Sequence, residues 1–206
     1  MVSTPFFLKG VIIGFSIAAP VGPIGVLCIR RTLAEGRLAG LVAGLGAATA
    51  DAFYGSVAGF GLAAISGFLI GQAQWFRLIG GAFLCYLGVR TFLSEPVEQA
   101  AAAHRAGLLG GYVSTLFLTL TNPMTILSFG AVFAGLGLAG AAGSYANAAI
   151  LVAGVFCGSA LWWVTLSAGV NALRGRFSPR SLRWVNKASG IVITAFGLLA
   201  LASVRS

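Results

Sequence analysis

The chain has 206 residues, of which 58% are hydrophobic and only 8% are charged. About a quarter of the residues in an ordinary soluble domain are charged, so this composition excludes such a domain and indicates an integral membrane protein. The net charge of +9 would suit a nucleic-acid partner only if the basic residues gathered on one solvated face. Here they lie between apolar runs, so we expect a lipid bilayer and no nucleic acid.

Apolar runs of about 20 residues, the length that crosses a bilayer, recur six times along the chain. They predict an all-α integral membrane protein with six transmembrane helices in a single domain over residues 1–206. The polar connections 94–107 and 173–187 are too short to fold independently. The six predicted spans are residues 6–29, 39–65, 74–93, 108–135, 147–172 and 186–204.

The first span contains its own helix breakers. Pro20 and Pro23 lack the amide hydrogen that a helix needs, and Gly22 and Gly25 tolerate unusual backbone angles. A break inside a membrane is acceptable only where the freed backbone groups are buried in protein or line a cavity. We therefore predict a substrate-binding break at these four residues, with a passive kink as the alternative.

Basic residues follow the odd-numbered spans. Ten of the 13 lysines and arginines lie in the connections after spans 1, 3 and 5, which places those connections inside and both termini outside. Arg30 and Arg31 are expected to begin the first inner loop. They serve either as topology signals or as an inner gate of ion pairs.

Asp51 is the only acidic residue inside a predicted span. A carboxylate at the centre of a membrane helix costs roughly 2.5–3.5 kcal/mol, so a compensating environment is required. The neighbouring glycines at spacings of four or seven share its helix face and mark a packing surface, either the bundle interior or a homodimer contact. We predict that Asp51 faces the interior and binds a proton, a sodium ion or a substrate ammonium group; the alternative is a protonated, purely structural carboxyl group.

The two halves of the chain resemble each other. Residues 22–27 match residues 122–127 at an offset of 100, with proline in the same place, and a pair of glycines seven residues apart recurs as Gly81 and Gly88 and as Gly190 and Gly197. A three-helix unit repeated in tandem enters the membrane with opposite polarity the second time. This predicts an inverted repeat, with repeat 1 at about 1–100 and repeat 2 at about 108–206, an architecture of many secondary transporters.

The repeat gives the fourth span a second break, at Thr121, Asn122 and Pro123. Both breaks and Asp51 fall near the middle of their spans, so we predict that they converge on one substrate site at the bilayer midplane. The hydroxyl of Thr121 is a candidate ligand, although threonine often bonds back to its own helix.

A family pattern runs through these positions. The N-terminal half carries it at Pro20, Gly22, Pro23, Arg31, Gly36, Arg37, Gly40, Gly44, Gly46 and Asp51. Together with Asn122–Pro123, the chain resembles the LysE/RhtB family of bacterial amino-acid exporters. The resemblance implies a six-helix carrier of the inner membrane that exports amino acids or close derivatives with the proton motive force. Many members have lysine where this chain has Met124, which leaves the substrate open.

Two other functions fit part of the sequence. A metal-cation exporter of related architecture would need several intramembrane carboxylates, histidines or thiolates, whereas a membrane thiol-disulfide carrier would need two of Cys28, Cys85 and Cys157 to meet. No phosphate-cradling motif or dinucleotide site is present in its required context. We therefore expect no cofactor, no bound metal and no enzymatic activity.

Overall fold

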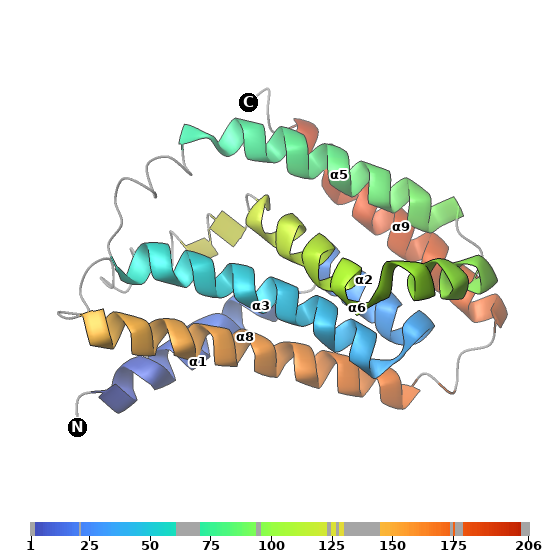
Figure 1. Cartoon of the computed structure of the whole chain (residues 1–206). Helices are drawn as coiled ribbons and strands as arrows, with labels where there is room; N and C mark the ends of the chain where they lie inside the picture. Colours follow the sequence, from blue (N-terminus) through green and yellow to red (C-terminus); the bar gives the residue numbers. More distant parts are fainter. Residues whose placement is uncertain are drawn as a thin grey trace.

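A computed structural model of the chain describes residues 3–20, 22–60, 71–93, 96–122, 125–126, 128–129, 145–173, 175 and 179–202. These residues form long helices that run roughly side by side (Figure 1). The fold is all-helical over the described part, as the sequence predicts. The helices are α1 (Ser3–Ala18), α2 (Pro23–Glu35), α3 (Arg37–Gly59), α5 (Ala73–Leu93), α6 (Pro96–Leu120), α8 (Tyr145–Leu173) and α9 (Pro179–Ala202).

The first predicted span is broken in its middle. Helix α1 ends at Ala18, α2 begins at Pro23, and the two are bent by 82°. Proline suits the first position of a helix because the amide it lacks would have no partner there. The break itself is confirmed, and its role in substrate binding stays a prediction.

Helix α2 continues to Glu35, so the expectation that Arg30 and Arg31 begin a loop was wrong. Long basic side chains can leave an apolar helix end for the membrane surface without ending the helix. Gly36 then turns the chain directly into α3 with a φ of 102°, a left-handed conformation that favours glycine.

The predicted polar connection 94–107 is largely helical, because α6 begins at Pro96. Its alanines and its glutamate and glutamine are good helix formers, and these propensities outweigh the polarity. Gly107, with a φ of 60°, separates this piece from the apolar stretch that follows. Similarly, α9 begins at Pro179, well before the apolar residues that defined the sixth predicted span.

Three single helices are long and apolar enough to cross a membrane, namely α3, α8 and residues 183–202 of α9. The bent pair of α1 and α2 passes the same test when the two helices are counted as one span, and residues 107–120 form a shorter apolar helix. In the described part of the chain, three of the six predicted spans are therefore present as single helices, and a fourth is present if the bent pair is one span.

The helices pack in two groups. Helix α8 lies along both α1 and α3, α6 packs on α3, and α5 pairs with α9. In Figure 1, α5 and α9 lie together above the other helices, with α2 and α6 between the two groups. Helix α1 begins and α9 ends toward the left of this view. The break in the first span is thereby held between the two helix groups.

Candidate functional site

A cavity of about 700 Å³ lies where the helix groups meet, and all seven described helices contribute to its wall. Its lining is mostly apolar. The residues predicted for substrate binding or ion coupling that line it are Pro20, Gly22, Pro23, Gly25, Asp51, Thr121 and Asn122. Described residues of both breaks and Asp51 thus lie around one cavity, while a substrate site at the bilayer midplane stays a prediction.

The first break presents a helix start to the cavity. Gly22 is the residue before α2, and no side chain caps this end. The Gly22 amide donates to the Pro20 carbonyl at 2.9 Å, and the Gly22 carbonyl accepts from the Val26 amide at 3.1 Å. The first turn of a helix has amides without intrahelical partners and a partial positive charge, so this end of α2 is suited to an anionic group.

The second break shares one backbone hydrogen bond with the first. Helix α6 ends at Leu120, and the Asn122 carbonyl accepts from the Ile126 amide at 3.3 Å. This bond is the counterpart, 100 residues later, of the one between Gly22 and Val26. Pro123 and Met124 lie outside the described residues, so the contribution predicted for Pro123 remains a prediction.

Two hydroxyl groups donate hydrogen bonds to backbone carbonyls at this break. The Thr121 hydroxyl donates to the Phe117 carbonyl at 2.9 Å, which leaves only its oxygen lone pairs for a ligand. Tyr54 of α3 donates its hydroxyl hydrogen to the carbonyl of Leu120, the last residue of α6. A carbonyl left unpaired by the break thereby obtains a partner from another helix.

Asp51 lies in α3 and is 3% exposed. Its Oδ2 accepts a hydrogen bond of 2.7 Å from the hydroxyl of Ser159 in α8. The Ser159 oxygen in turn accepts one of 3.2 Å from the indole nitrogen of Trp163. This chain of hydrogen bonds fixes the position of the carboxyl group at the cavity wall.

The glycines that share the face of Asp51 pack inside the bundle. Gly44 lies against the ring of Trp163, Gly55 against Val155, and Gly40 against Thr32 of α2. The face is therefore covered by helices of the same chain, as predicted for Asp51, and not left free for a second copy.

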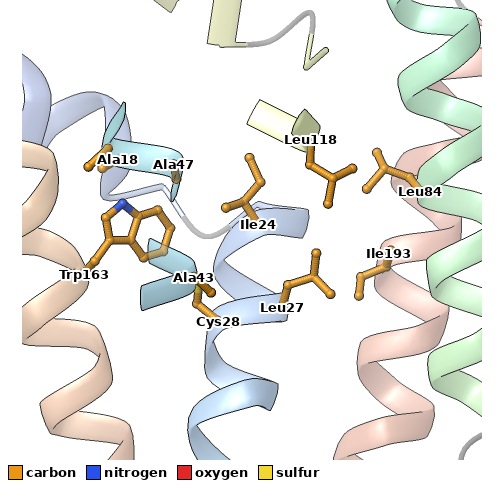
Figure 2. Close-up of a cluster of buried hydrophobic side chains, with 11 residues drawn as sticks. Ala18, Ile24, Leu27, Cys28, Ala43, Ala47, Leu84, Leu118, Trp163 and Ile193 are labelled. Atoms are coloured by element: carbon orange, nitrogen blue, oxygen red, sulfur yellow. The ribbon is translucent and has the colours of Figure 1, made fainter. Parts of the chain in front are cut away.

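An apolar cluster adjoins the cavity along α2. Figure 2 shows Ile24 and Leu27 of α2 pointing toward Leu118 of α6 and toward Leu84 and Ile193 of the α5–α9 pair. Ile24, Leu84 and Leu118 also line the cavity. The cluster therefore closes the cavity wall on the side toward the C-terminal end of α2.

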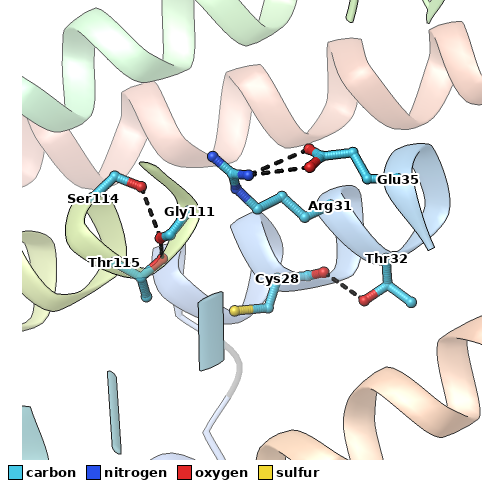
Figure 3. A network of polar contacts seen from close by, with 7 residues as sticks. All are labelled: Cys28, Arg31, Thr32, Glu35, Gly111, Ser114 and Thr115. Carbon is cyan, nitrogen blue, oxygen red and sulfur yellow. Dashed lines mark hydrogen bonds and ion pairs between the residues drawn. The ribbon is translucent and has the colours of Figure 1, made fainter. Parts of the chain in front are cut away.

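Arg30 and Arg31 lie beyond this cluster. Arg31 forms an ion pair of 3.3 Å with Glu35 of its own helix, and its guanidinium lies against Gly111 of α6 (Figure 3). Among the described residues, the buried Nε of Arg30 has no hydrogen-bond partner. Neither arginine lines the cavity, so they are separate from the predicted substrate residues.

The sequence analysis missed two polar residues of the site, Ser159 and Arg77. Ser159 is 108 residues after Asp51, close to the offset of 109 that relates the paired glycines, so the repeat carried a signal for it. Arg77 lines the cavity from α5. In the sequence analysis it was only one of the three basic residues that lie outside the connections after spans 1, 3 and 5.

The described residues offer little to a metal ion or a disulfide. No group of three or more histidine, cysteine, aspartate or glutamate side chains within them could hold a metal ion. Their free cysteines lie on three different helices, Cys28 on α2, Cys85 on α5 and Cys157 on α8.

Comparison with known proteins relates this architecture to a family. YcgF of Bacillus subtilis (strain 168), whose name describes it as a putative amino acid efflux protein, is 26% identical over 93% of this chain and 92% of its own. The uncharacterized membrane protein YahN of Escherichia coli (strain K12) is 30% identical over 82% of this chain and 77% of its own. The chemotactic transduction protein ChpE of Pseudomonas aeruginosa is 27% identical over 95% of this chain and 96% of its own.

No solved structure matches the chain at a significant level. The family model for LysE type translocators matches residues 15–203, which includes both breaks and all of the cavity-lining residues named above. The chain therefore belongs to the LysE family of membrane translocators.

Proposed function

We propose that this protein exports amino acids or close derivatives across the bacterial inner membrane, by alternating access around the cavity and in exchange for protons. The observation that carries the proposal is the meeting of two helix breaks and one buried carboxyl group at a single cavity. The start of α2 would bind the substrate carboxylate, and the end of α1, with its partial negative charge, would bind the amino group. Asp51 would carry the proton, with sodium as the other candidate ion.

Alternating access by an inverted repeat is supported by the α5–α9 contact. A Cβ added to Gly81 would lie 3.0 Å from the carbonyl oxygen of Gly197, and one added to Gly197 would lie 2.8 Å from that of Gly81. Gly88 and Gly190 meet in the same reciprocal way, at 2.9 and 2.8 Å. Gly81 corresponds to Gly190 in the repeat, and Gly88 corresponds to Gly197. Exchanging the two halves therefore converts the contact between Gly81 and Gly197 into the contact between Gly190 and Gly88, as expected around a two-fold axis.

The rest of the packing supports the same symmetry. Gly46 of α3 lies against the Tyr112 carbonyl of α6, and Gly154 of α8, 108 residues later, lies against the Phe7 carbonyl of α1. Asp51 and Ser159, also 108 residues apart, meet each other. We infer that α1, α3 and α5 correspond to α6, α8 and α9.

The direction of transport rests on the basic residues. Arg30 and Arg31 lie toward one end of the bundle, and the apolar cluster separates them from the cavity. The positive-inside rule places that end in the cytoplasm and both termini in the periplasm. Arg31, Glu35 and the apolar cluster would then form the inner gate.

The first test is efflux from proteoliposomes loaded with neutral, basic and hydroxy amino acids, with and without a pH gradient. We expect at least one of these amino acids to leave faster when the gradient is imposed. If no member of the panel leaves faster than from liposomes without protein, the proposed function is wrong.

The coupling role is tested by Asp51→Asn. The amide keeps the size of the side chain and can still accept a hydrogen bond from Ser159, but it cannot release a proton. We expect gradient-driven export to be abolished while the melting temperature of the purified protein stays within a few degrees of wild type. Export at the wild-type rate would rule out Asp51 as the coupling residue.

A further inference from the structure

The cavity has two charged side chains among its described lining residues, Asp51 of α3 and Arg77 of α5. Their charges are opposite, and the other lining side chains are apolar or uncharged. An ionised pair gives the empty cavity no net charge. A guanidinium group on the wall of a mostly apolar cavity can meet an anionic group of a substrate there.

Arg77 belongs to the face of α5 that forms the cavity wall. Arg77, Gly80, Gly81 and Leu84 follow the spacing of one helix face, and all four line the cavity. Gly80 fixes this face against the second break, since a Cβ there would lie 2.8 Å from the carbonyl oxygen of Thr121. Helix α5 is held mainly by its pairing with α9, and Gly80 brings the face that carries Arg77 close to the second break.

Arg77 lies in the first part of α5, and Asp51 lies in the second half of α3. At 1.5 Å per residue Arg77 is about 6 Å from the start of α5, whereas Asp51 is about 12 Å from the end of α3. Helix α5 starts and α3 ends toward the side on which α1 begins (Figure 1). Both charged residues therefore lie in the part of their helix toward that side.

We propose that Arg77 binds the substrate's carboxylate and thereby restricts export to zwitterionic amino acids with uncharged, mainly apolar side chains. This rests on the proposed function and specifies its substrate class. A guanidinium group binds a carboxylate through two parallel hydrogen bonds. It carries a full positive charge, whereas the start of α2 supplies only a partial one. A zwitterionic substrate has no net charge, and neither does a cavity with an ionised Asp51 and Arg77. The side chain of the substrate would contact the apolar part of the cavity wall, which includes Ile17, Phe196 and Leu199.

Cationic substrates are disfavoured by the same arrangement. Lysine would bring a second ammonium group into a cavity with one acidic side chain, and leucinamide has no carboxylate for Arg77. An unpaired charge in a cavity of low polarity is costly. The expected order of export is therefore leucine well ahead of lysine and leucinamide.

The test compares leucine with leucinamide in proteoliposomes of wild type and Arg77→Gln. We expect the ratio of leucine to leucinamide export to fall at least tenfold in R77Q. The ratio is measured on one preparation, so the amount of folded protein cancels. Lys9→Gln is the matched control, since Lys9 is an exposed basic residue toward the same end of the bundle and does not line the cavity; its ratio should equal that of wild type.

Each result decides the inference. An equal loss of both substrates in R77Q, or lysine export as fast as leucine export by wild type, overturns it while leaving amino-acid export intact. Absence of all amino-acid export by wild type removes the proposed function and this inference with it. If R77Q is not recovered from the membrane, Arg77→Lys replaces it, with an expected fall of at least threefold because an ammonium group lacks the two-pronged geometry.

Discussion

Replacing Ser159 with alanine tests whether the hydrogen bond between α3 and α8 positions Asp51 for transport. The change removes the hydroxyl that donates to Asp51 at 2.7 Å and accepts from Trp163 at 3.2 Å. A buried hydrogen bond to a charged group contributes roughly 1.5–3 kcal/mol. Since 1.4 kcal/mol corresponds to a factor of ten, the fraction of molecules with a correctly placed carboxyl group should fall roughly 10- to 100-fold.

The assay is the initial rate of leucine efflux from proteoliposomes under an imposed pH gradient. We expect a fall of roughly that size in Ser159→Ala and much of the rate to return in Ser159→Thr, which keeps a hydroxyl. Ser167→Ala is the matched control, because Ser167 is a buried serine of the same helix whose hydroxyl donates to the carbonyl of Trp163. A rate in S159A above half that of wild type, or an equal loss in S167A, would refute the positioning role.

Two further predictions concern stability and are measured by thermal unfolding of the purified protein. Gly88→Ala should lower the free energy of unfolding by about 1–3 kcal/mol, because its Cβ would lie 2.6 Å from the Thr194 amide nitrogen. Gly169→Ala, where nothing lies within 4 Å, should raise it by about 0.5–1 kcal/mol; equal effects would contradict backbone contact between α5 and α9. Tyr54→Phe should cost about 1–3 kcal/mol by leaving the Leu120 carbonyl unpaired. Tyr112→Phe should cost less, because its acceptor, the Thr49 hydroxyl, keeps its own bond to a backbone carbonyl; the reverse order would be inconsistent with this account.

Local chemistry explains which features the sequence could predict. Pro20 and Pro23 cannot take part in a continuous helix at any place in a fold, so their break was visible without a structure. Asp51 faces the interior because glycines lie on the same helix face, and that relation depends only on helical spacing. The end of α6 near Asn122 could be predicted because residues 122–127 match residues 22–27, where the first span breaks.

Tertiary contacts explain what the sequence could not predict. Ser159 is one of many hydroxyl residues in the chain, and only the packing of α8 on α3 brings it to Asp51. Arg77 lies in the first part of α5, where a basic residue is equally consistent with a membrane surface, and only the packing of α5 against the other helices shows that it meets a cavity. Helix ends were misjudged for a related reason, since apolarity ended at Arg30 although the α2 helix continued to Glu35.

The balance at Asp51 suggests why a carboxyl group in this position can couple two processes. Placing it within the membrane costs roughly 2.5–3.5 kcal/mol, and the bond from Ser159 returns roughly 1.5–3 kcal/mol. The two nearly cancel, so the charged form is tolerated without being strongly favoured. In the proposed function, a substrate ammonium group near the carboxyl group, or a proton on it, would shift this balance. Each would therefore alter the occupancy of the other, which is the relation that exchange transport requires.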